Sequence, residues 1–210
     1  SKAGYVTKRA TIEASADTTT VPVALEKAPA SSLVDFDSAW PSFRGSDDNM
    51  AITDAKTPRT ADEAKLLWGA KLTSGWDRVS NTLIVGENLY ALAGKEIKKI
   101  DKATGNVIAT GALVSDNSWY DGRLAYGDGM LFATVGNGRV QALNADTLES
   151  LWVYQNENGG QPNCPITVCD GYLYTGFWTG EETAADFVCL TVTDEDPSQT
   201  HEAKTAAWRY

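Results

Sequence analysis

The sequence has few of the residues on which most catalytic and metal centres depend. It contains one histidine, His201, so a zinc site or a histidine-based catalytic triad would rest on a single imidazole. The three cysteines are an odd number and cannot all pair within the chain. These counts argue against zinc chemistry and against triad catalysis.

Basic residues and long apolar runs are scarce as well. The 18 Lys and Arg against 28 Asp and Glu leave a net charge of −10, which argues against nucleic-acid binding because phosphates require a basic face. No apolar run approaches the roughly 20 residues that span a bilayer. No signal peptide is present, and because the chain starts at Ser1 we expect it to be processed or cut from a longer sequence.

Aromatic residues and glycine are plentiful instead. Seven Trp, eight Tyr, five Phe and 18 Gly, with few helical patterns, predict an all-β protein of many short strands. One short helical stretch is predicted at Thr60–Lys65, where Thr60 would be the N-cap and Glu63 would complete a capping box.

The first part of the chain differs in pattern from the rest. Residues 1–28 hold two alternating segments around a turn candidate at Ala16–Thr19, and residues 29–39 have the composition of a linker. The pattern of residues 1–28 resembles the closing hairpin of surface β-sandwich modules of the carboxypeptidase-regulatory-like or PEGA type. The alternative is a hairpin that packs on the main domain, residues 40–210.

A repeat of about 42 residues organises that main domain. A tight turn precedes an apolar and aromatic strand at Gly86–Tyr90, again at Asp128–Phe132 and again at Asp170–Tyr174. A strand that carries Trp closes the units at Trp68, Trp152 and Trp208, whereas the intermediate copy has Ala109–Thr110 instead. The third unit carries extra residues at Gly180–Asp186 and Thr193–Thr205.

Four strands per repeat of this length predict four-stranded antiparallel β-propeller blades. The Asp-x-x-Thr-Gly turn followed by a Trp strand, with Asp-Gly-x-Leu-Tyr before it, resembles the PQQ-like (quinoprotein alcohol dehydrogenase-like) propeller repeat. The stretch Trp40–Gly45 resembles the N-terminal part of such propellers. The resemblance implies a scaffold that quinoprotein dehydrogenases, outer-membrane assembly scaffolds and surface proteins share.

The number of blades is too small for a closed ring. Residues 69–210 supply about three units, whereas a propeller needs four to eight. We therefore expect a fragment of a longer protein, with the incomplete ring closed by missing sequence or by self-association of copies through open blade edges.

Binding in a propeller usually falls on loops at one face, and the loops before each first strand are spaced by the repeat. Trp and Arg suit stacking on a flat ligand, a sugar or a peptide side chain, although Trp76 and Trp119 could instead fill gaps between blades. The candidate binding residues of this loop face are Trp76, Asp77, Arg78, Trp119, Tyr120, Asp121, Arg123 and Asn163.

The resemblance also raises the question of a cofactor. It implies PQQ held between a Trp and a disulfide of adjacent cysteines, with calcium and an Asp base, but the sequence has no adjacent Cys pair. Cys164 and Cys169 cannot bridge without a turn, and Cys169 and Cys189 are predicted to be buried free thiols. The acidic runs Asp47–Asn49 and Asp194–Asp196 lack an EF-hand pattern and are interpreted as solvated loops.

These observations favour a non-catalytic scaffold or binding module that presents propeller loops for protein or carbohydrate recognition, with no cofactor and no catalytic or metal-ligating residue assigned. The module resemblance and the acidic, Thr-rich composition favour an exported bacterial protein at the cell surface or outside the cell. The alternative is a fragment of a PQQ-dependent quinoprotein alcohol dehydrogenase-like enzyme, with calcium, whose cofactor site needs the missing blades.

Overall fold

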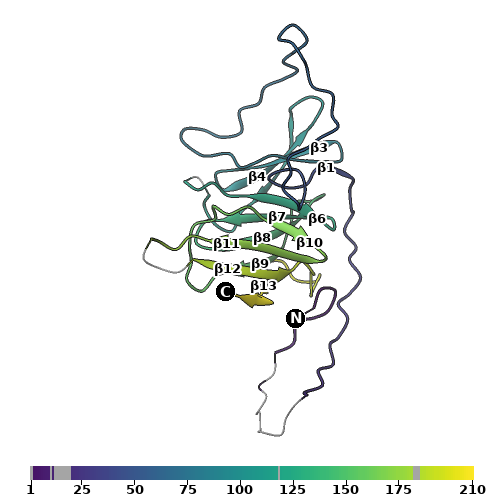
Figure 1. The fold of residues 1–210 in the computed structure, drawn as a ribbon, viewed down its shortest axis with the longest axis vertical. Helices are drawn as coiled ribbons and strands as arrows, with labels where there is room; N and C mark the ends of the chain where they lie inside the picture. The colour runs from purple at the N-terminus through teal and green to yellow at the C-terminus, as the bar shows by residue number, and fades with distance from the viewer. Residues whose placement is uncertain (1, 10, 12–19, 118, 182–184) are drawn as a thin grey trace.

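The regular structure of the chain is all β. The computed structural model describes residues 2–9, 11, 20–117, 119–181 and 185–210, and no helix forms among them. Three sheets, two of five strands and one of four, lie one beside the next along the molecule (Figure 1). All strand pairs within the sheets are antiparallel except that of β13 with β9. The predicted all-β class is confirmed.

Each sheet contains one predicted blade of four strands. The first blade is formed by β2 (Leu83–Val85), β3 (Asn88–Ala93), β4 (Glu96–Asp101) and β5 (Val107–Ala112). The second is formed by β6 (Leu124–Gly127), β7 (Met130–Val135), β8 (Arg139–Asn144) and β9 (Ser150–Gln155). The third is formed by β10 (Thr167–Cys169), β11 (Tyr172–Phe177), β12 (Asp186–Thr191) and β14 (Trp208–Arg209). The first strands of neighbouring blades contact one another, β2 with β6 and β6 with β10, as the central strands of a propeller do.

Two further strands join these blades from elsewhere in the chain. β1 (Ser38–Trp40) pairs with β2 at the central edge of the first blade. β13 (Glu202–Lys204) lies in the predicted insertion Thr193–Thr205 and pairs in parallel with β9, the outer strand of the second blade. The chain therefore leaves the third blade, extends the second, and returns to form β14. The other insertion, Gly180–Asp186, lies partly outside the described residues.

Two hydrophobic cores lie between the blades. Alternate residues of each strand point to opposite faces of a sheet, so the second blade contributes to both cores. The core between the first and second blades includes Leu83, Tyr90, Leu92, Ile97, Leu124, Leu131 and Leu143. The core between the second and third blades includes Phe132, Ala142, Trp152, Leu173, Phe177, Val188 and Leu190. A blade thus buries its faces against its neighbours and has no core of its own.

The same main-chain carbonyl accepts a hydrogen bond in each blade. It belongs to the first residue after the third strand, and we call it the acceptor carbonyl. The Trp68 indole donates to the carbonyl of Lys102 at 3.1 Å, and the Trp152 indole donates to that of Val192 at 3.3 Å. At the remaining interface, where the sequence lacks a Trp, the Tyr90 hydroxyl donates to Ala145 at 2.8 Å.

The N-terminal segment crosses the blades at the tight turns that follow their first strands. Ala3 lies against Gly171, Val34 lies against Gly129, and the Gly86 amide donates to the Asp37 carbonyl at 2.7 Å. We call residues 28–37 the strap; it follows the side of the sheets in Figure 1.

The expected hairpin of residues 1–28 pairs at its base and packs on the third blade. Tyr5 forms an antiparallel bridge with Lys27, and the Gly4 amide donates to Thr193 Oγ1 at 2.8 Å. This contact agrees with the alternative that residues 1–28 form a hairpin packed on the main domain. That these residues end an upstream β-sandwich module stays a prediction. The turn candidate at Ala16–Thr19 lies outside the described residues.

Two local predictions are corrected by the structure. The stretch Thr60–Lys65, expected to be one or two helical turns, forms a single exposed turn in which the Ala64 amide donates to the Ala61 carbonyl, because a segment this short does not sustain a helix. The run Asp194–Asp196 is not a solvated loop, because Glu195 forms an ion pair at 3.0 Å with the buried amine of Lys204. No described helix has the length and apolar character needed to cross a membrane.

Tyr90 makes stability sensitive to high pH. Burial, with a smaller contribution from the charge of Asp146, raises the pKa of Tyr90 to about 12. The neutral phenol is favoured in the folded state, so its contribution is complete below the unfolded pKa of about 10 and is lost as pH rises toward 12.

We expect Tyr90→Phe to lower the free energy of unfolding by about 1 kcal/mol at pH 7, because the Ala145 carbonyl loses its donor. Between pH 10 and 12 the variant should lose less stability than the wild type does, as measured by urea unfolding. Tyr210→Phe, at an exposed position, is the control and should follow the wild type. An equally steep loss in Tyr90→Phe would contradict this assignment.

Candidate functional site

The predicted loop face lies at the opposite end of the sheets from the strap. Each first strand begins at one of the candidate loops and ends at a turn that the N-terminal segment covers. Side chains of the loops are therefore separated from the strap by the length of a strand.

Two neighbouring loops of this face are joined directly. Arg78 and Asp121 form an ion pair with 2.7 Å between Nη1 and Oδ1, and both side chains are about half exposed. Beneath them, the Asn81 side chain exchanges two hydrogen bonds with the main chain of Leu124, at 2.9 and 3.1 Å. An exposed ion pair contributes about 0–1 kcal/mol, so the two partly buried hydrogen bonds of Asn81 are the stronger determinant of the loop geometry.

The two tryptophans of the loop face do not fill gaps between blades. Trp76 is 90% exposed and Trp119 is 75% exposed. Large aromatic side chains gain stability from burial, and these two gain almost none within the described structure. Their exposure argues against the packing interpretation.

The remaining candidates are less closely grouped. The guanidinium of Arg123 stacks over the Phe43 ring at 4.8 Å, and its buried Nε has no hydrogen-bond partner. Asp77 accepts a hydrogen bond from Thr73 through its carbonyl, and Tyr120 lies against Gly136. Asn163 donates to Gln161 of its own loop, so no described hydrogen bond of its side chain joins the third loop to the other two.

Sequence reasoning missed Asn81 and Phe43, which support this face. Asn81 bonds Leu124 at a separation of 43 residues, and Arg78 pairs with Asp121 at the same separation. Because this separation is close to the repeat length, comparing equivalent positions could have found both pairs. No signal in the sequence places Phe43 beneath Arg123.

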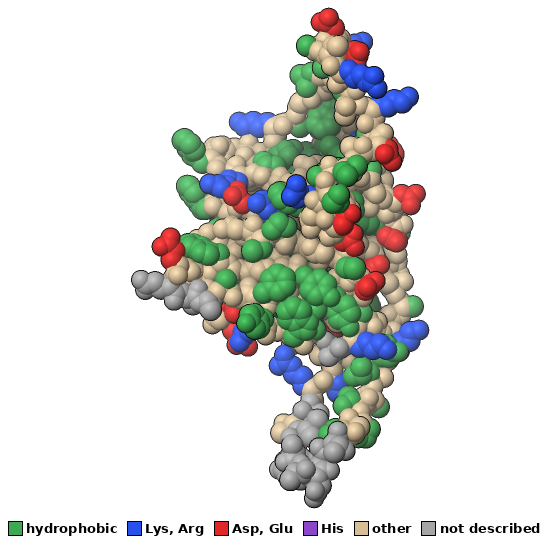
Figure 2. Space-filling model, in the orientation of Figure 1, with side chains coloured by type: hydrophobic (Ala, Val, Ile, Leu, Met, Phe, Trp, Pro, Cys, Tyr) green, Lys and Arg blue, Asp and Glu red, His purple; other side chains and the backbone are tan. Residues whose placement is uncertain are grey.

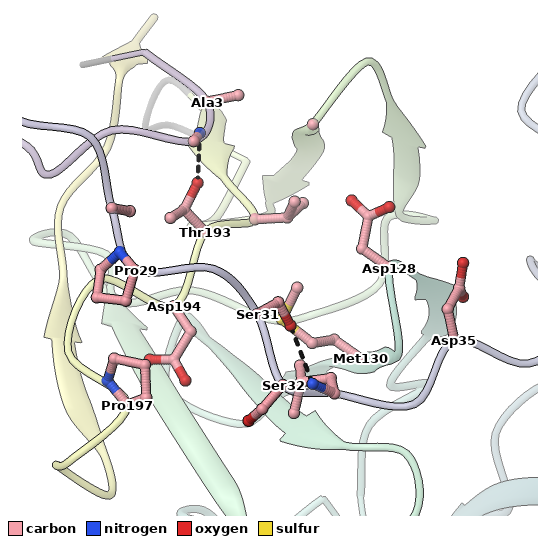
Figure 3. Close-up of a pocket in the computed structure, with 15 residues that line it drawn as sticks. Ala3, Pro29, Ser31, Ser32, Asp35, Asp128, Met130, Thr193, Asp194 and Pro197 are labelled. Atoms are coloured by element: carbon pink, nitrogen blue, oxygen red, sulfur yellow. Dashed lines mark hydrogen bonds between the residues drawn. The ribbon is translucent and has the colours of Figure 1, made fainter.

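A cavity lies on the opposite side, between the strap and the second and third blades (Figure 3). Its volume is about 390 Å³, within the range of small-molecule sites. Leu33, Met130 and Val192 contribute apolar surface. The carboxylates in its lining belong to Asp35, Asp128 and Asp194, and the lining has no Lys or Arg.

The carboxylates of the cavity differ in their surroundings. Asp35 accepts a hydrogen bond from the Tyr126 hydroxyl at 2.8 Å. Burial, with the charge of Glu202 next, raises the pKa of Asp194, and its Oδ1 has no hydrogen-bond partner. The cavity is formed by the course of the strap, which the sequence does not predict.

The cysteines do not fit the PQQ site that the resemblance implies. All three are free; Cys189 is buried as predicted, but Cys169 is only partly buried, so that prediction is wrong. Cys169 lies at the end of β10, an edge strand of its sheet whose three residues are all only partly buried. Without adjacent cysteines the chain lacks the disulfide platform, and the described residues bring together no group of three His, Cys, Asp or Glu side chains suited to a metal.

The geometry defines a partial β-propeller of three four-stranded blades. No protein-family profile matches the sequence, and no curated protein sequence does. Among solved structures it is similar to quinohemoprotein alcohol dehydrogenase ADHIIG from Pseudomonas putida HK5, with a TM-score of 0.61 and 17% identity over 82% of this chain. A europium-containing methanol dehydrogenase gives 0.50 and 17% over 69%.

The chain spans about a quarter of these two proteins, 26% of each. BamB from Moraxella catarrhalis is a more distant structure, with a TM-score of 0.42, 18% identity and coverage of 61% of this chain and 38% of that one. The similarity to the two dehydrogenases confirms the fold, the predicted PQQ-like propeller blades in a partial ring.

A substitution at Gly129 tests how closely the strap is held against the turn of the second blade. Its φ is +78°, and a Cβ there would lie 2.8 Å from the Val34 carbonyl oxygen. We expect Gly129→Ala to push the strap away and increase proteolysis between residues 28 and 37.

The matched control is Gly75→Ala, which has a similar φ of +74° but no atom within 4 Å of the added Cβ. Both variants carry the backbone strain of an L-residue at positive φ, about 1 kcal/mol. Only Gly129→Ala should also expose the strap. Equal proteolysis of the two variants would show that the strap is not held at this turn.

Proposed function

We propose that the chain is a non-catalytic scaffold and binding module of an exported bacterial protein, and that its loop face recognises a protein or carbohydrate ligand. The observation that carries the proposal is the exposure of Trp76 and Trp119 beside the joined loops of Arg78 and Asp121. Exposed aromatic side chains next to polar groups are typical of recognition surfaces.

The chemistry of this face suits a ligand with flat apolar surface and hydroxyl or carboxylate groups. An indole can stack on the face of a sugar or on a peptide side chain. Arg78 uses one described contact, to Asp121, while a guanidinium carries five N–H donors, so donors remain for a ligand. The ion pair holds Arg78 in place at the boundary between two blades.

An enzyme fragment is the second candidate, because two structural neighbours, with TM-scores of 0.61 and 0.50, are dehydrogenases. Titration of the chain with PQQ and Ca²⁺ tests it. Tight binding with a shifted cofactor absorbance would favour the enzyme; the missing cysteine pair leads us to expect neither.

A glycan array and affinity capture of proteins from the culture should identify a ligand. Its affinity is then measured with purified components. We expect Trp76→Ala, Arg78→Ala and Trp119→Ala together to weaken its binding at least about thirtyfold, since removing central Trp or Arg contacts costs about 2 kcal/mol or more. Arg123 is left intact because it stacks on Phe43.

The control is Leu66→Ala with Leu67→Ala, two exposed apolar positions outside the loop face. Both sets should melt within a few degrees of the wild type because the changed side chains are exposed. Unchanged affinity in the loop-face variant would show that recognition takes place elsewhere.

A further inference from the structure

Each of the three blades presents one exposed indole on the loop face. Trp76 and Trp119 lie on the loops that precede the first strands of the first and second blades. In the third blade, Gln161 stands 42 residues after Trp119, where the repeat would place the next indole. Trp178, which is 43% exposed, follows β11, and its main chain forms an antiparallel bridge with that of Gln161, with N–O distances of 2.8 and 3.2 Å. The third blade thus supplies its indole from another loop, beside the repeat position.

The three indoles are separate platforms and do not form one apolar patch. None of the ring–ring contacts in the described part of the chain includes Trp76, Trp119 or Trp178. Figure 2 shows hydrophobic side chains that project at separate levels along the edge of the molecule opposite the strap, with charged side chains between them. The centre of a protein–protein interface is a contiguous apolar region with polar groups at its rim. Spaced aromatic platforms with polar groups between them instead suit a ligand that repeats.

The indoles follow the order of the blades, whose first strands contact one another in sequence, β2 with β6 and β6 with β10. Sheets packed face to face lie about 10 Å apart. In an extended β-1,4-linked polysaccharide each ring is turned over relative to the next, so the same ring face recurs at every second ring, at about this interval. Three indoles at the blade spacing therefore match alternate rings of one chain, over about five rings.

The polar groups beside the indoles are suited to sugar hydroxyls. Arg78 and Asp121 join the first two loops, and the Asn163 amide donates to Gln161 Oε1 at 3.2 Å in the third. A guanidinium donates, a carboxylate accepts, and a carboxamide does both. A hydroxyl group also donates and accepts, so this set of side chains can bond it in either sense.

The charges of this face favour a neutral ligand. Arg78 is paired with Asp121, and Lys95 Nζ lies 3.6 Å from Asp116 Oδ2. A nucleic acid, whose bases also stack on aromatic side chains, needs a positively charged groove along its backbone. Cations that are already paired, in a chain with a net charge of −10, do not provide such a groove for a nucleic acid or for an anionic polysaccharide.

We propose that the loop face binds a single neutral, extended β-1,4-linked polysaccharide chain across the three blades, with one indole of each blade stacked on alternate rings. This inference rests on the proposed function and narrows it, because it names the ligand class and adds Trp178 to the binding residues. Each indole covers the apolar face of one ring, and the polar side chains bond the hydroxyls. Contacts linked along one chain act through effective concentration, so the affinity depends on chain length.

Isothermal titration calorimetry with β-1,4-linked oligosaccharides of two to six rings tests the proposal. The probes are the four series built from glucose, xylose, mannose and N-acetylglucosamine. We expect at least one series to bind, with an affinity that rises at least about tenfold from three rings to five. From five rings to six the affinity should change little, since five rings already reach the third indole.

Trp178→Ala removes only the third platform. It should weaken binding of the five-ring oligosaccharide at least about tenfold and leave the three-ring affinity within about twofold, because three rings bridge Trp76 and Trp119. Trp119→Ala removes the central platform and should weaken binding of both lengths. Trp178→Phe keeps an aromatic ring and should retain most of the five-ring affinity.

Trp208→Ala is the matched control, because Trp208 belongs to the same blade and is 47% exposed but lies on β14, within the sheet and not on the loop face. Its affinity should equal that of the wild type at every length. Thermal melting identifies any loss of folding in each variant. A loss of folding would also lower the affinity for all lengths alike, whereas removal of one platform affects the longer chains alone.

Three outcomes would overturn the inference: no binding of any six-ring oligosaccharide at millimolar concentration, an affinity that does not change with length, or a Trp178→Ala variant that binds five rings as the wild type does. A protein or a short branched glycan that binds the wild type, but not the variant of Trp76, Arg78 and Trp119, would remove this inference and leave the proposed function standing. Ligand binding that is unchanged in that variant would remove both.

Discussion

The packing of one blade against the next is the interaction on which the whole structure depends. A four-stranded sheet with apolar side chains on both faces cannot bury them alone, and the cores of this chain lie between blades. A hydrogen bond to the acceptor carbonyl accompanies each contact, from an indole or a phenol. At equivalent turn positions, Gly105 of the first blade leaves room for the Trp68 ring, whereas Leu148 of the second blade fills that space. The repeat therefore specifies surfaces as well as strands.

That constraint also explains how the two ends of the chain differ. On the first blade, Trp68 covers the turn at Gly105, and Ala91 and Ile100 on the outer side of the sheet are buried. On the third blade nothing equivalent covers the described aromatic surface over β11 and β12.

The strands could be predicted from the sequence because their register is set by local turns. Asp128 and Asp170 adopt positive φ beside Gly129 and Gly171, as the Asp-Gly pairs indicated. The strap could not be predicted, since it contacts backbone at those turns without any periodic pattern. Cys169 was misassigned because its burial depends on a neighbouring blade. The loops of the candidate site could be predicted from the repeat. The contacts that join two of them, made by Asn81 and Arg78, required the structure.

The path of β13 has a consequence for how the molecule resists unfolding. In repeat proteins, stability is approximately a sum over units and their nearest-neighbour contacts, and units can come apart one at a time. Here β13, which lies between β12 and β14 in the chain, belongs to the sheet of the second blade, and Lys204 on β13 is buried against Trp152. The third blade cannot separate from the second unless β13 is also removed from the edge of the second blade's sheet. Mechanical load applied at the C-terminus would thus be shared by the second and third blades before it reaches the core between the first and second blades.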